Sequence, residues 1–474
     1  MRYHPLALVT LLAGCAGAPP PLPPPPAPSA YLARPAELGE AQRLLPGQDI
    51  PAQWWTLFRS PALDALLRQA LADSPSLARS SARLRQAEYE HAAQAGASRY
   101  PRVDARLSAN RIDVEPQALG APALPLQTPF NLFLASVGVS YQFDLFGANR
   151  QALAALQAGV DQQRYELEAA RLMLAGNLVT AAIREAALRE QIAGSEALLA
   201  LRERQLAIVE RLEQLGGAAR DELARQRQEL AQQRAQLPEL RRQLEQLRHR
   251  LAVLSGQTPG EARLPEFRLA DLQLPAELPL SLPSELARQR PDIRAAEALL
   301  QQAGARLGVA TANLYPQITL SANLGSLSPH AGDLFGAGSA FYLLGASLTQ
   351  PIFRGGELQA RRSAAQAGWE QAGAAYREAV LQGLQNVADV LRALEADAQR
   401  LREREEAAAQ ARRHREILVA RQRAGGVSQL ALLDGEWRLQ TALLERSQAL
   451  ADRHADSAAL LQALGGGWWA APAP

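Results

Sequence analysis

Residues 137–147 read Val137-Gly138-Val139-Ser140-Tyr141-Gln142-Phe143-Asp144-Leu145-Phe146-Gly147, with apolar side chains alternating with small or polar ones. Such period-two alternation is typical of a β-strand with one apolar face. From Ala148 to Leu215 the chain then contains no proline, and its apolar residues recur at helical spacing. At a rise of about 1.5 Å per residue, a helix over this run is on the order of 100 Å long. The sequence therefore predicts a strand that leads directly into a very long helix.

The same arrangement occurs a second time. Arg99-Tyr100-Pro101 opens the first alternating region, and Leu314-Tyr315-Pro316 opens a second one that ends at Pro351-Ile352-Phe353-Arg354-Gly355-Gly356 before another long proline-free run. A double glycine, Gly216-Gly217 or Gly425-Gly426, interrupts each long helix, and a further helix follows. The period of roughly 210 residues far exceeds the 20 to 50 of a solenoid repeat. The chain is therefore interpreted as a unit fused to its own copy.

These patterns predict an order of segments along the chain. They are a signal peptide at 1–14, a lipidated cysteine and proline-rich tether at 15–52, a first repeat at 53–255, an inter-repeat linker at 256–283, a second repeat at 284–464 and a C-terminal tail at 465–474. The predicted strands lie at about 102–114, 133–145, 317–326 and 341–350, and the predicted long helices at 148–215, 218–255, 355–424 and 427–464.

Each predicted strand has about the ten residues that cross a bilayer when tilted. Alternation with one apolar face is typical of outer-membrane barrel strands, but a soluble antiparallel sheet with one wet face has the same pattern. The long helices are expected to pack side by side as coiled-coil pairs, because none can bury an apolar stripe alone.

The N-terminus indicates export and lipid attachment. Pro5 to Leu12 is mainly apolar but too short to span a bilayer, which is typical of a signal peptide. Leu12-Ala13-Gly14-Cys15 resembles the bacterial lipobox, which implies cleavage before Cys15 and acylation of that cysteine. By the same resemblance, Ala16 after it favours sorting to the outer membrane. The alternative is an ordinary signal peptide with an incidental cysteine.

Composition argues against several classes of function. The 474 residues carry a formal net charge of +2, no lysine, and no basic stripe with interleaved aromatics, so we expect no nucleic-acid partner. Cys15 is the single cysteine, and the six histidines form no His-Glu-x-x-His pair. We therefore expect no enzyme, no catalytic residue, no metal site and no cofactor apart from the covalent lipid on Cys15.

Residues 282–297 carry the clearest family resemblance. They read Leu282-Pro283-Ser284-Glu285-Leu286-Ala287-Arg288-Gln289-Arg290-Pro291-Asp292-Ile293-Arg294-Ala295-Ala296-Glu297. This segment resembles a signature of the outer-membrane efflux proteins, the lipoprotein channels of tripartite drug and metal pumps that are similar to TolC and OprM. Trp54-Trp55, the Tyr315-Pro316 pair and the Gly355-Gly356 corner fit the same family. The resemblance covers nearly everything from Trp54 to Leu464.

The resemblance implies an α+β membrane protein. Three copies, with four strands each, would close a twelve-stranded barrel that the long helices continue as an α-helical periplasmic barrel. About eight strands leave an interior just filled by side chains, so twelve can enclose a wet lumen.

The implied function is that of a lipid-anchored channel in the bacterial outer membrane. It would passively conduct drugs, other small molecules or ions that an inner-membrane RND-type pump exports, with a periplasmic adaptor as further partner. Two alternatives stay open: the outer-membrane component of a type I protein secretion system, and a periplasmic adaptor or scaffold lipoprotein. The sequence names neither substrate, pump nor adaptor.

The resemblance also implies site residues. Asp434 matches the position whose carboxylate rings the closed aperture, with Glu436 close by; three symmetry-related carboxylates would attract cations and raise one another's pKa. The alternative is a solvated carboxylate near a helix start. Trp437 stands where related channels often carry Arg, so their ion-pair pattern would be absent. The implied adaptor-docking tips, with plain glycine turns as the alternative, are Gly216, Gly217, Gly425, Gly426, Val427 and Ser428.

Overall fold

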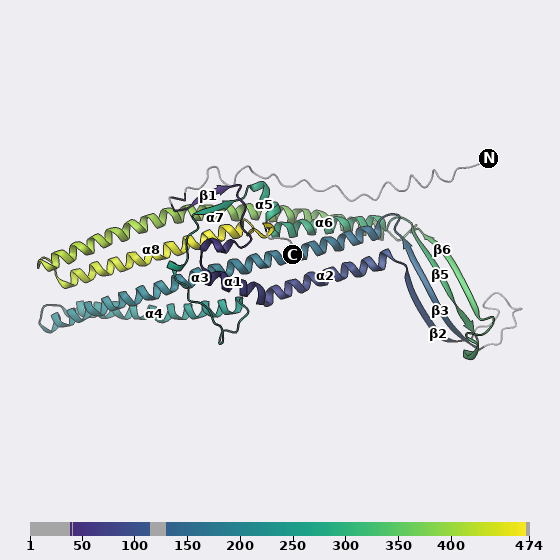
Figure 1. Ribbon diagram of the computed structural model, residues 1–474, viewed down its shortest axis with the longest axis horizontal. Helices are drawn as coiled ribbons and strands as arrows, with labels where there is room; N and C mark the ends of the chain where they lie inside the picture. The colour runs from purple at the N-terminus through teal and green to yellow at the C-terminus, as the bar shows by residue number, and fades with distance from the viewer. Residues whose placement is uncertain (1–37, 40, 114–128, 471–474) are drawn as a thin grey trace. The chain divides into compact units, whose positions relative to one another are not determined.

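The computed structural model describes residues 38–39, 41–113 and 129–470 (Figure 1). The expected signal peptide, the lipidation site Cys15 and much of the tether lie outside the described residues. The rest forms two compact units. The first comprises Arg83–Gln163 and Ala296–Tyr376, and the second takes the remaining described segments. The first unit contains the strands of both repeats, and the second contains most of the helix pairs of both repeats.

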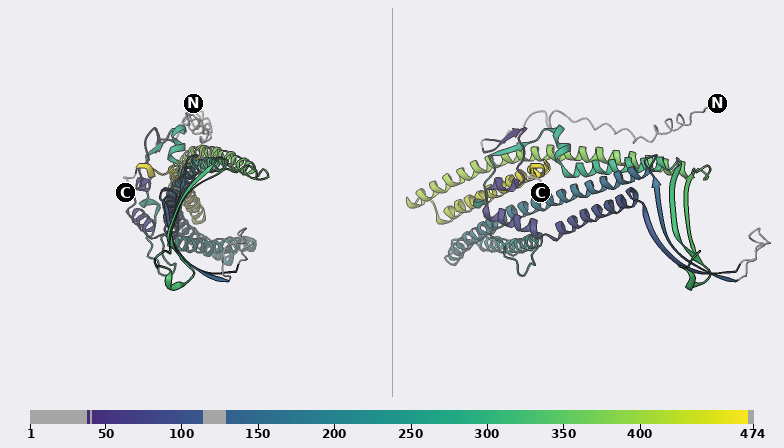
Figure 2. Two further views of the ribbon diagram at one scale, coloured as in Figure 1. Left: turned by 90° about the vertical axis from the view of Figure 1, so that its right-hand side faces the viewer. Right: turned by 45° about the vertical axis from the view of Figure 1, so that its right-hand side comes forward.

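A four-stranded antiparallel sheet forms the centre of the first unit. Its order is β2-β3-β5-β6, with β2 (Arg102–Ile112), β3 (Phe130–Phe143), β5 (Gln317–Ser328) and β6 (Ala340–Thr349) (Figure 1). The sheet is strongly curved (Figure 2). The two repeats meet at its middle, where β3 pairs with β5 from Phe133 opposite Ser328 to Phe143 opposite Ile318.

The seam between β3 and β5 depends on small residues. A Cβ atom added at Gly325 would lie 2.4 Å from the carbonyl oxygen of Ala135, and one at Gly138 would lie 2.6 Å from Oδ1 of Asn323. At Gly325 the obstacle is backbone, so a larger residue does not fit, whereas a side chain at Gly138 would have to displace the Asn323 amide.

The outer strands β2 and β6 each have one edge without a strand partner among the described residues. Large apolar side chains on them are uncovered: Leu107 of β2 is 78% exposed and Leu344 of β6 is 73% exposed. An unpaired edge and an uncovered apolar face both call for a further partner, which this single chain does not supply.

Helices extend from the strand ends. In the first unit, the start of α3 (Ala148–Gln214) is fixed by Asp144, whose carboxylate accepts hydrogen bonds from the amides of Asn149 and Arg150 at 3.0 and 2.9 Å. This part of α3 packs against α6 (Pro291–Ala312), where Gln302 Nε2 donates to the carbonyl oxygen of Ala155. The other helices that reach this unit are α2 (Pro75–Arg99) and α7 (Glu357–Arg423).

The second unit is built on two antiparallel helix pairs (Figure 1). α3 pairs with α4 (Arg220–Leu254), and α7 pairs with α8 (Gln429–Ala463). Three α4 arginines spaced by seven residues bind three α3 glutamates spaced by seven in the opposite direction: Arg227–Glu210 at 3.0 Å, Arg234–Glu203 at 2.7 Å and Arg241–Glu196 at 2.7 Å. A seven-residue interval of interhelical ion pairs is typical of a coiled coil, as the sequence predicted.

Short elements flank these helices in the second unit. They are β1 (Arg43–Pro46), β4 (Glu277–Leu280), α1 (Pro61–Asp73), α5 (Pro283–Gln289) and the 3-10 turns η2 (Trp54–Phe58), η4 (Leu269–Asp271) and η6 (Trp468–Ala470); a further turn, η5 (Ala331–Asp333), lies in the first unit. β1 and β4 pair in parallel, so part of the expected tether and part of the expected linker form one small sheet. Within the described ranges, no helix has an apolar stretch long enough to cross a membrane.

The chain beyond α8 also folds back. Gly465, Gly466 and Gly467 all have positive φ, and a Cβ atom at Gly467 would lie 2.3 Å from the carbonyl oxygen of Ile50. Trp468 Nε1 then donates to the carbonyl oxygen of Gln289 at 2.6 Å. The three glycines allow a turn that side chains would block, and the indole locks the end of the chain against α5.

Candidate functional site

The predicted tips are tight glycine turns at the ends of the helix pairs. Gly216 has φ +74° and Gly425 has φ +75°, and the next glycine in each turn donates its amide to a carbonyl of the last helical turn, at Leu212 and Arg421 respectively. This is the backbone pattern of a helix that ends in a left-handed residue. Ser428 caps α8 by accepting a hydrogen bond from the amide of Ala431.

Both turns are exposed at the end of their hairpins. A Cβ atom at Gly216 or Gly425 would meet no atom within 4 Å, and Leu215 beside the first turn is 69% exposed. The glycines therefore serve the turn geometry and leave open space around the tips. Adaptor docking at these residues stays a prediction.

Asp434 lies in α8, close to the second tip, with its side chain 54% exposed. Its Oδ2 accepts a hydrogen bond at 2.8 Å from Nε of Arg438, one helical turn further along. The bond to Asp434 raises the pKa of the Arg438 guanidinium. Arg438 thus places a cation beside the predicted ring carboxylate, a partner that the sequence analysis overlooked although the i, i+4 spacing shows it.

Glu436 has a different setting from Asp434. Its carboxylate, 24% exposed, lies 3.5 Å from Nη2 of Arg415 on α7 and 3.8 Å from Nη2 of Arg204 on α3. Two residues apart on a helix point to different sides, which explains the separate partners. Glu436 therefore joins α8 to both long helices, whereas Asp434 is paired only along its own helix by the contacts of the described residues.

Trp437 forms a contact that sequence reasoning missed. The guanidinium carbon of Arg202 on α3 lies 4.0 Å from the centroid of the Trp437 ring, and Arg202 also pairs with Glu229 of α4 at 2.9 Å. The indole packs on a small apolar cluster of Leu198, Leu201 and Leu433. A stacked cation of this kind stabilises by about 0.5 to 2 kcal/mol, depending on burial.

The contact of α8 with its neighbours is close on both sides. A Cβ atom at Gly435 would lie 2.4 Å from Cδ1 of Leu418 on α7, and one at Gly194 of α3 would lie 2.2 Å from Cδ2 of Leu444 on α8. Glycines therefore let α8 approach α7 and α3 near the tip. Separation of α8 from α3 here would break the Arg202–Trp437 stack and the Glu436–Arg204 ion pair together.

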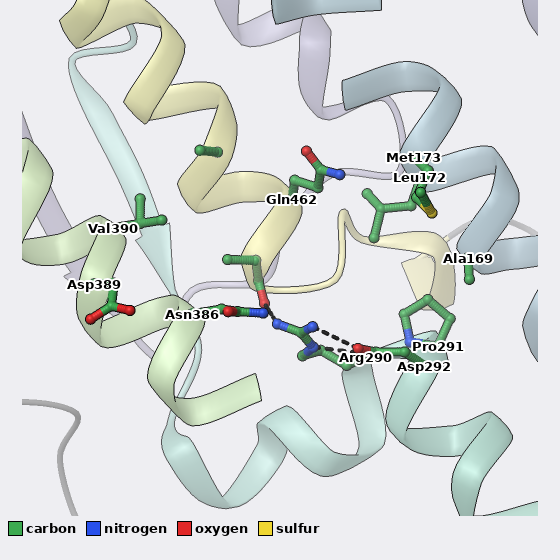
Figure 3. A pocket seen from close by; sticks show the side chains of 12 residues that line it. Ala169, Leu172, Met173, Arg290, Pro291, Asp292, Asn386, Asp389, Val390 and Gln462 are labelled. Carbon is green, nitrogen blue, oxygen red and sulfur yellow. Dashed lines mark hydrogen bonds and ion pairs between the residues drawn. The ribbon is translucent and has the colours of Figure 1, made fainter. Parts of the chain in front are cut away.

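The family-like segment around Arg290 lines a groove of about 470 Å³ (Figure 3). Arg290 Nη1 donates to the carbonyl oxygen of Ala463, at the end of α8, at 2.9 Å. The same guanidinium binds both carboxylate oxygens of Asp292, at 3.0 and 2.6 Å. The positive charge lies at the negative end of the α8 dipole, so Arg290 joins the end of α8 to the start of α6. The groove is also lined by Leu172, Met173, Asn386, Asp389 and Gln462.

The arrangement of the histidine, aspartate and glutamate side chains also bears on metal binding. Within the part of the chain that the structure describes, no group of three or more histidine, aspartate or glutamate side chains is arranged to hold a metal ion. The predicted lipidation site Cys15 lies outside this part. Two predictions therefore stay untested by the geometry: the lipid on Cys15, and the absence of any other cofactor.

The sequence model of the outer membrane efflux protein family matches residues 66–257 and 282–466. These two blocks include all four long helices and all four strands of the large sheet. The chain therefore belongs to the outer membrane efflux protein family.

Particular relatives agree over nearly the whole length. The pyoverdine export outer membrane protein OpmQ of Pseudomonas putida is 32% identical over 470 residues, covering 98% of this chain and 97% of the relative. OpmQ of Pseudomonas aeruginosa is also 32% identical, covering 99% and 98%. The solved outer-membrane channel OprN superposes with a TM-score of 0.84 at 27% identity, covering 96% of this chain and all of OprN.

The protein is thus an outer-membrane channel of an efflux system, and its family consists of channels rather than enzymes. The match to both repeats decides against the periplasmic adaptor that the sequence had left open. The strand-and-long-helix architecture, mostly helical with some strands, is confirmed by the solved relatives.

Proposed function

We propose that three copies of this chain form the exit duct of a tripartite efflux system. The sheets close into a twelve-stranded barrel in the outer membrane, and the helix pairs close into a tunnel in the periplasm. The observation that carries the proposal is the four-stranded sheet, which is strongly curved (Figure 2). Among the described residues it has two free edges, and large apolar side chains on it are uncovered. A bilayer offers no water to unpaired strand edges, so each free edge needs a strand from another copy.

The proposed attachment and partners rest on the sequence. Cys15 carries the lipid that anchors the chain in the outer membrane, where each buried methylene contributes about 0.8 kcal/mol. A periplasmic adaptor docks at the glycine tips, Gly216-Gly217 and Gly425 to Ser428, and links the channel to an inner-membrane RND-type pump. The pump supplies the energy, and the channel conducts passively.

The gate lies at the tip end of the helix pairs in this proposal. Asp434 of each copy faces the axis of the closed aperture, and Glu436 with Trp437 holds α8 against α3 and α7 behind it. The support is the cluster of contacts in this segment and the exposure of Asp434.

The proposed cargo is a small organic molecule. The relatives at 32% identity are named for export of pyoverdine, and others at 28% for efflux of antibiotics and toluene. A compound of the pyoverdine kind is the first cargo to test, because the OpmQ proteins are the more similar relatives.

The experiment combines assembly, conduction and export. The full-length protein is extracted from outer membranes, run unheated and heated on gels, and inserted into planar bilayers. A strain lacking it is assayed for retained pyoverdine and fluorescent dye. We expect a heat-sensitive trimer, discrete conductance steps, and cargo retention that the intact gene reverses. A monomer without conductance would overturn the proposal. Normal small-molecule export with loss of a secreted protein would favour type I secretion instead.

A further inference from the structure

Asp397 is a buried carboxylate in the α7–α8 pair, far along the helices from the tip residues. Its side chain is 7% exposed. One oxygen, Oδ1, accepts a hydrogen bond from Nη2 of Arg400 at 2.7 Å. The other oxygen, Oδ2, is buried and has no donor among the described residues. A buried carboxylate oxygen without a donor is costly, so a hydrogen-bond donor for Oδ2 is expected at this site.

The carboxyl of Asp456 on α8 faces Asp397, close enough for a hydrogen bond between the two side chains once one of them is protonated. Two ionised carboxylates cannot hydrogen-bond to each other, because neither carries a hydrogen. The bond exists only when one proton is shared between them. A shared proton on Asp397 or Asp456 therefore favours the packed helices, because it removes the repulsion between two facing anions.

The neighbouring charges do not remove this requirement. Arg400 of α7 binds Asp397 but also binds Asp452 of α8, at 2.7 Å, so one guanidinium is divided between carboxylates. Arg453 of α8 is buried, but it donates to Gln42 Oε1 and to the Leu38 carbonyl oxygen instead. The charged groups that act on the pair are therefore the bound cation of Arg400, the buried cation of Arg453 and a third carboxylate, Asp452.

We propose that Asp397 and Asp456 form a proton-binding site that holds α7 against α8, and that loss of the shared proton loosens this helix pair. The α7 residues that flank Asp397 in the sequence include four that are buried: Val387, Leu391, Leu394 and Leu401. Two facing anions in this setting repel each other and lose their mutual hydrogen bond. The inference does not depend on cargo, adaptor or number of copies.

The direction of the pH effect follows from linkage. Burial, followed by the bond to Asp456 and the charge of Asp456, raises the pKa of Asp397 from 3.8 to about 7. A raised carboxyl pKa means that the packed pair holds its proton while the opened pair has lost it. Stability of the packed pair is therefore greatest at low pH, falls as the pH rises from 3.8 to about 7, and is level above that.

The test is hydrogen–deuterium exchange of the full-length protein in membranes at pH 6, 8 and 9, corrected for intrinsic exchange. Peptides that contain Asp397 or Asp456 should exchange on the order of tenfold faster at pH 8 than at pH 6, with little further change at pH 9. Asp397→Asn keeps the shape, removes the charge and should abolish the increase. Asp456→Asn should act in the same way, so a folding defect in one variant leaves the other informative.

The matched control is Asp389→Asn, also on α7 but exposed and hydrogen-bonded to Gln385. It should keep the wild-type pH dependence. A second readout is the carbonyl band of a protonated carboxyl in infrared difference spectra between pH 6 and 8, which should vanish in Asp397→Asn. Wild-type exchange that is flat between pH 6 and 8, or an Asp397→Asn protein that keeps the increase, would overturn the proposal.

Discussion

At the scale of single residues, Trp437 shows how one aromatic side chain can connect two helix pairs. Its ring takes the guanidinium of Arg202 on one face while Glu229 pairs with the same cation. An arginine at this position would bring a second cation beside Arg202. The indole instead joins the helix pairs α3–α4 and α7–α8 through a contact that salt screens less than an exposed ion pair.

Trp437→Ala should weaken the attachment of α8 to α3. Loss of the stack and of the packing on Leu198, Leu201 and Leu433 should raise deuterium uptake around Trp437 by roughly threefold to thirtyfold. Trp437→Phe, which keeps a smaller aromatic face, should lie between wild type and the alanine variant. Equal uptake in all three proteins would show that the stack contributes nothing to closure.

Asp434→Ala should raise the basal conductance in planar bilayers and weaken block by added cations. The reason is that the carboxylate, together with its Arg438 partner, occupies the proposed narrow ring. Asp221→Ala, in the first turn of α4, is the matched change in the first hairpin and should have a smaller effect. If conductance and cation block are unchanged by Asp434→Ala, the ring assignment is wrong.

At the scale of elements, the strands and long helices follow from local pattern. The change from period two to helical spacing sets where β3 ends at Phe143 and where α3 begins at Ala148, within a few residues of the prediction. Asp144 and Gly147 reinforce this corner, because one caps the helix and the other has positive φ. Such features are local, so the sequence alone shows them.

The site contacts depend on which helices become neighbours, and local pattern does not show that. Arg202 and Trp437 are more than two hundred residues apart, and their types give no sign of a pair. Asp397 did leave a signal: it follows Leu394 by three residues and precedes Leu401 by four, which is core spacing in a coiled coil. A charged residue at a core position of a coiled coil predicts a buried polar network. Its neighbour on the other helix, Asp456, cannot be identified without the fold.

Pro238 departs from the usual placement of proline in helices, because it lies inside α4 rather than in the first turn. An interior proline removes one helical hydrogen bond and costs about 3 kcal/mol. Pro238 is exposed, so Pro238→Ala should lose no packing and should slow local exchange in α4 at least tenfold. Gln236→Ala, an exposed neighbour, is the control and should change little. Unaltered exchange in Pro238→Ala would mean that packing on α3 fully offsets the missing bond.

At the scale of the whole molecule, the two hairpins show which positions of the repeats correspond. Val103 pairs with Val139 in the first hairpin, and Ile318 pairs with Leu348 in the second. Val103 and Ile318 each stand two residues after a Tyr-Pro pair, so they are equivalent. Val139 therefore corresponds to Leu348. The register of the β3–β5 pairing inside the chain then predicts the register of the proposed β6–β2 pairing between copies.

The register between copies gives a cross-linking prediction. Val139 pairs with Ala322 across β3 and β5, and Ala322 corresponds to Leu107. Leu348 of one copy should therefore lie opposite Leu107 of the next. Directly opposed strand residues have Cα atoms about 4.5 to 5.5 Å apart, a separation that a disulfide can bridge.

Leu107→Cys combined with Leu348→Cys should yield cross-linked dimers and trimers on non-reducing gels. The displaced pair Leu107→Cys with Leu344→Cys, four residues away on the same strand, should not, and neither should either single variant. Efficient cross-linking of the displaced pair, or none of the matched pair, would contradict the proposed closure. This test measures the register between copies and does not depend on transport.

The pairing of β3 with β5 also bears on the origin of the proposed three-copy assembly. In that assembly the contact between repeats inside one chain is also the contact that closes the ring, so a single repeat carries both halves of every seam. An ancestral half-length chain would have needed six copies to complete the same wall. Fusion turned three of six encounters between separate molecules into folding steps within one chain, which removes the translational entropy cost of each. It also freed the two tips to diverge, and only the second now carries Asp434 and Trp437.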